Sequence, residues 1–390
     1  MISVTEAIKL VNSFSNKMPS VSKPIHKILG CFLAEDVYSP INMPPFKQSS
    51  MDGYAFIHSK NTEFKIQGEV PAGSSENFDI NTNQAIRIFT GSRIPDDADT
   101  VVMQEHTERK GDFLKIKNVP EKGVNVRPIG NQIKKGEIAL KKGTYLNEAA
   151  IGFLAGLGIS EVNVYKKPKV SILVTGNELQ QVGENLQEGQ VYDSNSITLK
   201  LALKQLGIKK VRVLKVKDTF KATYKIIKKE LNKSDILLIS GGISVGDYDF
   251  VQKALIDNNV QEVFYKVNQK PGKPLWFGYK NNTKVFALPG NPASSLSCFY
   301  VHVLPLLRTS LGFENPHLPK KTAVTTSDIK NIHGKTLFLK GTVENGKATL
   351  LGGQASSMLK SFAICNALLV VPENETMIKK GQKIEYIKLN

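Results

Sequence analysis

The feature that most constrains the fold is an alternation of strand-like and helix-like segments between residues 169 and 318. The segments follow one another as VSILVTG, SITLKLALKQLG, KVRVLKV, YKIIKKELNKS, DILLISGG, DFVQKALIDN, VFALPG and SSLSCFYVHVLPLLRTSLG. Such alternation is typical of parallel strands joined by right-handed crossover helices. We therefore predict a central doubly wound α/β domain with a mostly parallel sheet over residues 169–318.

The segment before this domain has two different patterns. Ser3 and Glu6 form a capping box ahead of an amphipathic, helix-like run. A second helix-like stretch covers residues 28–34, and a further helical pattern begins at Asn147. Residues 41–140 read instead as short strands separated by turns rich in Gly, Pro, Asp and Asn. This order predicts a β-rich module, residues 41–140, inserted into an elongated helical domain made of residues 1–40 plus 141–168.

Helical patterns disappear after the α/β domain. LFLKGTVENGKATLL predicts a hairpin that turns over Glu344, Asn345 and Gly346, and NALLVVP and KIEYIKL read as further strands. We predict a small β-barrel-like domain over residues 319–390.

Composition excludes several classes of protein. Of the 390 residues 41% are hydrophobic, but no apolar stretch approaches the ~20 residues that a membrane helix needs. The N-terminus shows no signal-peptide pattern, so we expect a cytoplasmic protein without a membrane partner. The net charge of +17 comes from scattered lysine pairs rather than a basic run, which disfavours nucleic-acid binding. The cysteines, Cys31, Cys298 and Cys365, are too far apart in sequence to indicate a zinc site.

Four Gly- or Pro-rich motifs occur in the α/β domain. Ligands of such sheets bind beyond the carboxyl ends of the strands. They are TGNEL at 175–179, SGGISVGDYD at 240–249, KPGKP at 270–274 and LPGNP at 288–292. Gly241, Gly242 and Gly246 would let backbone N–H groups approach an anion, and Gly290 with the helix start at Asn291 and Pro292 would present further free N–H groups. Taken alone, each motif is equally consistent with a structural turn.

The acidic residues in these motifs point to a cation. If Glu178, Asp247 and Asp249 converge, each like-charged pair at about 4 Å costs on the order of 4 kcal/mol at an effective dielectric constant near 20. Mg²⁺ prefers oxygen ligands and commonly bridges carboxylates to phosphate. Lys270 and Lys273 would neutralise other anionic oxygens. The motifs therefore predict a phosphate site with a metal ion beside it.

In combination, the motifs make the whole chain resemble the molybdopterin molybdenumtransferase family, the molybdenum-insertion enzymes related to the C-terminal domain of gephyrin. The resemblance rests on the four motifs above together with SSMDGYA at 49–55, GEVPAG at 68–73, RIFTGSRIPDDADTVVMQE at 87–105 and NVRPIG at 125–130. It implies insertion of molybdenum from molybdate into adenylylated molybdopterin, with release of AMP and with Mg²⁺ as cofactor. The pterin dithiolene supplies the sulfur ligands, which explains why no cysteine motif is needed.

The resemblance also implies a homodimer whose active site is shared between the α/β domain of one subunit and the β-rich module of the other. A molybdopterin adenylyltransferase and apo-molybdoenzymes would be its protein partners.

Roles for individual residues follow from the matched positions. Catalytic roles fall to Asp52, Thr90, Glu178, Asp249, Lys270 and Lys273. Metal ligands would be Glu178, Asp218 and Asp249, although an aspartate at the position of Asp218 is also a common helix N-cap. Substrate contacts are expected from Arg127, Ser240, Gly241, Gly242, Ser244, Gly246, Pro289, Gly290, Asn291 and Pro292.

Two departures and two alternative functions accompany this interpretation. Gln132 and Asn177 stand where the family commonly has aspartate, so each removes a charge. A molybdopterin adenylyltransferase would share the α/β domain, but such proteins usually consist of that domain alone. A gephyrin-like scaffold would keep the fold without the reaction, yet it would have little use for a cluster of acids and lysines.

Overall fold

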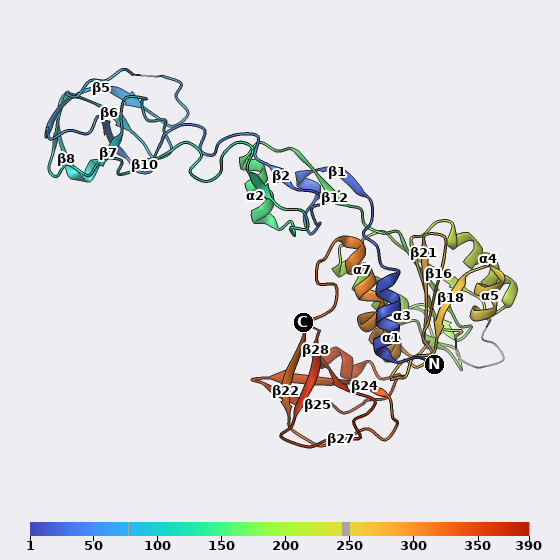
Figure 1. Cartoon of the computed structure of the whole chain (residues 1–390). Helices are drawn as coiled ribbons and strands as arrows, with labels where there is room; N and C mark the ends of the chain where they lie inside the picture. The colour runs from blue at the N-terminus through green and yellow to red at the C-terminus, as the bar shows by residue number, and fades with distance from the viewer. Residues whose placement is uncertain (77, 244–249, 390) are drawn as a thin grey trace. The chain divides into compact units, whose positions relative to one another are not determined.

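The computed structural model describes residues 1–76, 78–243 and 250–389. Its chain contacts define two compact units (Figure 1). The larger unit comprises Met1–Val21, Gly30–Ala34 and Val164–Asn390, and the smaller comprises Ser22–Leu29 and Glu35–Asn163. None of the helices in the described ranges has the length and apolar character needed to span a membrane.

A six-stranded sheet forms the centre of the larger unit, in the order β16-β13-β17-β21-β20-β18. The first four strands of this order are parallel. Only β20 runs the opposite way, since β18 pairs antiparallel with β20 and so shares the direction of the others, which confirms the predicted mostly parallel α/β sheet. The strands are β13 (Val170–Thr175), β16 (Val211–Val216), β17 (Ile236–Ser240), β18 (Gln261–Tyr265), β20 (Trp276–Lys280) and β21 (Thr283–Leu288).

Helices cover both faces of this sheet because its central strands are apolar on both sides. In β13, Ile172 and Val174 belong to one core and Leu173 to the other. One face is covered by α4 (Phe220–Leu231) and α5 (Val251–Asp257), which lie side by side (Figure 1). The other is covered by α1 (Val4–Ser13), α3 (Asn195–Gln205), α6 (Pro292–Cys298), the π-helical turn η3 (Phe299–Val303) and α7 (Leu304–Leu311). Two short strands, β14 (Leu179–Gln180) and β15 (Val191–Tyr192), pair beyond β13.

A buried carboxylate ties α4 to the sheet. Glu230 is fully buried; its carboxylate accepts hydrogen bonds from Arg212 at 2.7 Å and from Ser171 Oγ at 2.9 Å. We expect Glu230→Ala to lower the free energy of unfolding by about 2–3 kcal/mol, because Arg212 loses its carboxylate partner and Ser171 keeps only its hydrogen bond with Ser234 Oγ. Urea unfolding measures this loss. The matched control is Glu385→Ala, whose pair with Lys320 is half exposed and should be worth less than about 1 kcal/mol. Equal losses in the two variants would contradict the assignment.

The C-terminal part of the larger unit is a closed barrel. Its strands run β24-β25-β22-β28-β26, and an additional pairing of β26 with β24 closes the ring. The barrel strands are β22 (Lys320–Thr325), β24 (Thr336–Glu344), β25 (Lys347–Leu350), β26 (Ala367–Val371) and β28 (Lys383–Lys388), with β23 (Ile329–Lys330), β27 (Met377–Ile378) and α8 (Lys360–Ile364) beside them. The β24–β25 turn places Asn345 and Gly346 at positive φ, so the predicted hairpin is confirmed.

The smaller unit is built on a second six-stranded sheet, in the order β7-β4-β6-β5-β9-β8. Its strands are β4 (Gly53–Phe56), β5 (Glu63–Val70), β6 (Gln84–Ile88), β7 (Thr100–Met103), β8 (Thr107–Lys110) and β9 (Phe113–Ile116). The same unit contains β2 (Val37–Tyr38), β3 (Gln48–Ser49), β10 (Val126–Arg127), β11 (Ile138–Leu140), η1 (Ile25–Lys27), η2 (Gln104–His106) and α2 (Glu148–Gly156). Strands β1 (Ser20–Pro24) and β12 (Glu161–Tyr165) lie where the chain passes between units.

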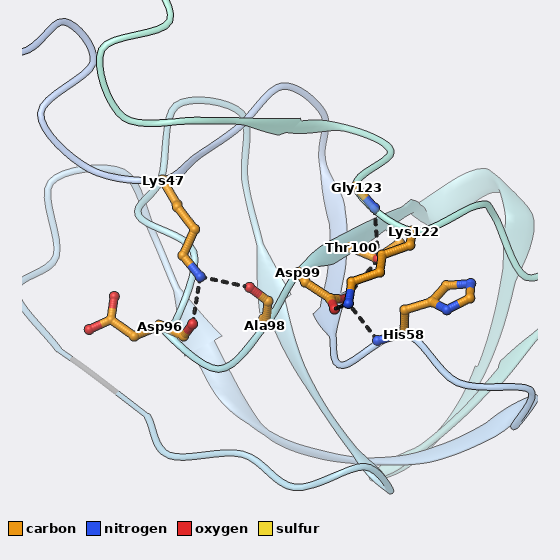
Figure 2. A network of polar contacts seen from close by, with 8 residues as sticks. All are labelled: Lys47, His58, Asp96, Ala98, Asp99, Thr100, Lys122 and Gly123. Atoms are coloured by element: carbon orange, nitrogen blue, oxygen red, sulfur yellow. Dashed lines mark hydrogen bonds and ion pairs between the residues drawn. The ribbon is translucent and has the colours of Figure 1, made fainter. Parts of the chain in front are cut away.

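Asp99 organises one end of the second sheet (Figure 2). Its carboxylate accepts hydrogen bonds from the His58 N–H at 2.8 Å and the Thr100 hydroxyl at 2.9 Å, and it pairs with Lys122 at 3.2 Å. Burial by itself raises the pKa of Asp99, but these three groups outweigh it and hold the pKa below the ordinary value of 3.8. The contacts therefore stabilise the unit above that pH and are lost as the pH falls through the lower folded-state pKa.

The local predictions near the N-terminus have mixed outcomes. Ser3 Oγ accepts the Glu6 N–H at 3.1 Å and α1 follows, as the capping box predicts. The helix expected over residues 28–34 is wrong. The 3₁₀ turn η1 ends at Lys27, before this stretch, and no helix follows, because Gly30 adopts a positive φ of 73° and Leu33 then bridges to Val164 as extended chain. Val4, Ala7 and Val11 of α1 pack in the core of the larger unit.

Candidate active site

A cavity of about 660 Å³ opens at the carboxyl ends of the parallel strands of the larger unit. Four chain segments that the sequence places far apart contribute to its wall. They are the loops after β13, β17 and β21 and the turn after β16, where Asp218 lies. Predicted site residues on this wall are Glu178, Asp218, Ser240, Gly241, Gly242, Pro289, Gly290, Asn291 and Pro292.

Glu178 reaches the cavity from the TGNEL loop. Gly176 has a φ of 145°, and a Cβ built on it would lie only 2.7 Å from Glu178 Oε1. The carboxylate therefore folds back over the glycine, where a side chain would displace it. Gly176 therefore has two roles: it allows the positive φ of the turn, and it leaves space for the Glu178 carboxylate.

Asp218 is paired with the same loop through two reciprocal hydrogen bonds. The Asn177 N–H donates to Asp218 Oδ2 at 3.1 Å, and the Asp218 N–H donates to Asn177 Oδ1 at 3.2 Å. The alternative of Asp218 as the cap of α4 is wrong, since Thr219 is the N-cap residue. Asn177 thus keeps the loop contact without adding a charge beside Asp218.

The SGG loop packs closely against Thr175. Gly241 and Gly242 have positive φ values of 92° and 63°, and added Cβ atoms would lie 3.0 and 2.9 Å from Thr175 Oγ1. Among the described residues, Thr175 Oγ1 is buried without a hydrogen-bond partner, although Thr175 lines the cavity. An unpartnered hydroxyl on the wall is a group that a bound polar ligand would satisfy.

Asn195 joins two of the loops and is a residue that the sequence analysis missed. Its Nδ2 donates to Ser240 Oγ at 2.9 Å and to the Gly290 carbonyl at 2.7 Å. Asp193, Ser194 and Ser357 also line the cavity without having been predicted. No local motif marks them, because an isolated Asn or Ser outside a glycine loop carries no distinctive pattern.

The expectation of free amides at the start of α6 is wrong for two residues. The N–H groups of Ala293 and Ser294 donate to the Ser356 carbonyl at 3.0 and 3.2 Å. Asn291 is the N-cap residue and Pro292 the first helical residue, but the Asn291 side chain makes no capping bond and donates instead to Ser356 Oγ at 3.1 Å. A segment of the barrel domain therefore caps this helix.

The two lysines of KPGKP do not line the cavity, although Pro274 of the same motif does. Lys270 lies in β19 (Gln269–Lys270), which adds to the barrel sheet through β24, and its Nζ is 2.7 Å from His333 Nε2. Lys273 is exposed and its carbonyl accepts the Val267 and Leu275 N–H groups. The motif is therefore shared between the cavity and the barrel.

The predicted site residues of the β-rich module lie together in the smaller unit. Asp52 Oδ1 accepts the Thr90 N–H at 2.7 Å and the Thr90 hydroxyl at 2.8 Å. The Thr90 backbone N–H, and after it the hydroxyl, lower the pKa of Asp52. Gln48 links this pair to Arg127, because its Nε2 donates to the Gly91 carbonyl at 3.1 Å and its Oε1 accepts from Arg127 at 3.5 Å.

Part of the predicted site lies outside the described residues. Ser244, Gly246, Asp247 and Asp249 belong to the segment 244–249. Within the ranges that are described, no group of three or more His, Cys, Asp or Glu side chains forms a metal-binding cluster.

Models of known families match three consecutive parts of the chain. The MoeA N-terminal region (domain I and II) matches residues 2–158, a probable molybdopterin binding domain matches residues 171–309, and the MoeA C-terminal region (domain IV) matches residues 322–389. Together they cover almost the whole sequence.

Individual relatives match over similar lengths. The molybdopterin molybdenumtransferase of Haemophilus influenzae is 35% identical over 363 residues, 90% of this chain and 89% of the relative. That of Staphylococcus epidermidis is 31% identical over 400 residues, 99% of this chain and 95% of the relative. Two solved structures of a molybdopterin biosynthesis MoeA protein from Pyrococcus horikoshii are each 30% identical to this chain and cover 100% of it. Their TM-scores are 0.86 and 0.82, and the matches cover 99% and 100% of the solved chains, respectively. The chain therefore belongs to the MoeA family of molybdopterin molybdenumtransferases.

Proposed function

We propose that this chain inserts molybdenum into adenylylated molybdopterin and releases AMP in a Mg²⁺-dependent step of molybdenum-cofactor biosynthesis. Its substrates are then the adenylylated pterin and molybdate. The observation that carries the proposal is the convergence of Glu178, Asp218 and the two glycine-rich loops on one cavity. A chain that matches the family from end to end supplies the reaction class.

The loops suit the nucleotide end of the substrate. Gly241 and Gly242 let the backbone approach a phosphate without Cβ interference, and beside them lies Thr175 Oγ1, which has no hydrogen-bond partner among the residues that the structure describes. Asn195 holds the Ser240 and Gly290 loops at a fixed separation, so both contact the ligand from preset positions. Binding and orientation are the main contributions of these residues.

The carboxylates fit a magnesium ion. Mg²⁺ is usually held by one or two carboxylates together with substrate phosphates and water, and Glu178 and Asp218 supply two on the same wall. We assign them as its ligands, with Asp249, which lies outside the described residues, as a further one. When bound, the ion supplies positive charge that neutralises the phosphate oxygens.

A second copy of the chain completes this site in our proposal. Asp52, Thr90 and Arg127 form one group in the smaller unit, linked through Gln48. Lys270 and Lys273 do not line the cavity of this chain, and we propose that their exposed ammonium groups supply cationic donors for the oxyanions once the site is complete. We propose a cytoplasmic homodimer in which the group from one subunit faces the cavity of the other. A molybdopterin adenylyltransferase would deliver the substrate, and apo-molybdoenzymes would receive the product.

The domain boundaries expected near residues 40, 140, 168 and 318 stay predictions. The family matches have limits at residues 158, 171, 309 and 322, close to the boundaries at 168 and 318, and give no limit near residues 40 or 140. Limited proteolysis that cuts at these positions would support them.

The decisive test is a reaction with purified components. Given adenylylated molybdopterin, molybdate and Mg²⁺, the protein should release AMP and yield a cofactor that activates an apo-molybdoenzyme. Leaving out molybdate should suppress AMP release, and so should leaving out Mg²⁺. Release of AMP that ignores molybdate, or no release with all three present, would contradict the proposal.

A further inference from the structure

Lys340 is a buried lysine in the wall of the barrel. Its side chain lies on β24 and only 1% of the residue is exposed. Among the described residues it forms no ion pair with a carboxylate. A lysine is rarely buried unless its ammonium is satisfied by specific partners.

Three backbone carbonyls satisfy this ammonium. Lys340 Nζ donates to the carbonyls of Gly353, Ala355 and Met358 at 2.7, 3.2 and 3.1 Å. Three donated bonds require the protonated amine, because a neutral amine has two N–H groups. Lys340 is therefore a cation that holds the loop 353–358 by its carbonyl dipoles.

The Lys340 backbone binds the same loop. Its N–H donates to Gln354 Oε1 at 3.0 Å, and Gln354 Nε2 donates back to the Lys340 carbonyl at 2.8 Å. The loop 353–358 contains no helix or strand, and five hydrogen bonds join it to Lys340, while the Ser361 hydroxyl donates to its Gly353 and Met358 carbonyls.

The loop held in this way reaches the cavity. Its Ser356 carbonyl caps the Ala293 and Ser294 N–H groups, its Ser356 hydroxyl accepts from Asn291, and its Ser357 lines the cavity. Lys340 is thus connected to the LPGNP wall through one short loop.

We propose that Lys340 is a positioning residue that fixes the LPGNP wall of the active site through the loop 353–358. The barrel domain then sets the position of Asn291, Pro292 and Ser357 for the substrate. Lys340 itself need not touch the ligand. This role deepens the proposed function and rests on it, because it concerns the binding of the same substrate.

Lys340→Met tests the role, since methionine fills the space without donating a hydrogen bond. Amide hydrogen exchange should accelerate in peptides covering residues 289–298 and 350–360. The KM for adenylylated molybdopterin should rise about ten-fold with kcat changed less than about two-fold, because Glu178 and Asp218 lie on other segments.

Ile384→Ala is the matched control. Ile384 is 1% exposed in the same barrel and belongs to its apolar core, so the variant destabilises the barrel without removing a bond to the loop. It should leave exchange at residues 289–298 and the KM unchanged. Wild-type exchange and KM in Lys340→Met, or equal effects in both variants, would overturn the proposal.

Two further measurements keep the test decisive. If Lys340→Met does not fold, Ser356→Ala replaces it. Ser356 is half-buried, and the substitution removes the hydroxyl that accepts the hydrogen bond from Asn291. An unchanged KM in that variant would overturn the proposal. If the wild-type protein releases no AMP, the proposed function fails, while the exchange comparison still decides whether Lys340 fixes the LPGNP wall.

Discussion

Replacing Glu178 by glutamine is expected to lower the rate of AMP release by about 100-fold, the usual cost of removing one electrostatic contact from a reaction centre. Glutamine keeps the shape of the side chain over Gly176 but removes the negative charge that a magnesium ion requires. Single-turnover AMP release, measured over a range of Mg²⁺ concentrations, should also show a higher Mg²⁺ requirement.

Glu188→Gln is the control for this variant. Glu188 is exposed, lies in the next loop of the chain and does not line the cavity, so its loss should change the rate less than two-fold, about the size expected for a distant surface charge. A wild-type rate in Glu178→Gln would remove Glu178 from the proposed metal site. Equal losses in both variants would indicate a general charge effect on substrate attraction.

Gly242→Ala is expected to damage stability and ligand binding together. The backbone at Gly242 has a φ of 63°, and the added Cβ would lie 2.7 Å from Val251 Cγ2 and 2.9 Å from Thr175 Oγ1. The left-handed conformation and the overpacking together should lower the free energy of unfolding by about 2–4 kcal/mol. The SGG loop must move to relieve the contacts of the added Cβ with Val251 and Thr175. The affinity for AMP should therefore fall about ten-fold as well.

Gly346→Ala is the control that separates the effect of the left-handed backbone conformation from the effect of overpacking. Gly346 has a similar φ of 75°, but nothing lies within 4 Å of the position where its Cβ would be built. This variant should lose only about 1 kcal/mol and keep wild-type AMP affinity. Thermal unfolding and calorimetric titration with AMP check both values. If Gly242→Ala matched Gly346→Ala in both measurements, the close packing around Thr175 would be unimportant.

The local features of the fold were predictable because each depends on neighbouring residues. The apolar runs of β13, β17 and β21, the cap at Ser3 and the turn at Asn345 and Gly346 are all short-range patterns. The expected helix over residues 28–34 failed for the complementary reason. A few apolar residues matched a helical spacing, but Gly30 turned the chain and Leu33 found an extended partner at Val164, far away in sequence.

The candidate site was predictable only in part. Parallel strands bring the residues after their carboxyl ends to one edge, so the convergence of Glu178, Gly241 and Gly290 followed from the alternation of strands and helices. Asp218, on the same wall, was expected only from the resemblance to the family. Asn195, Thr175 and Ser357 were missed because their roles arise from contacts between loops. The amides of α6 were expected to be free because no short-range pattern reveals a cap supplied by Ser356, more than 60 residues away.

By itself, the sequence determined the α/β sheet, the edge at which its loops meet and, through its motifs, the family. Only the tertiary structure decided that the C-terminal barrel closes through β24 and β26, that Lys340 is buried within it and that its loop forms part of the cavity wall. The reason is physical. Strand and helix patterns follow from the period of side chains along the chain, whereas the partner of a carbonyl or an ammonium is set by the packing of segments that are remote in sequence.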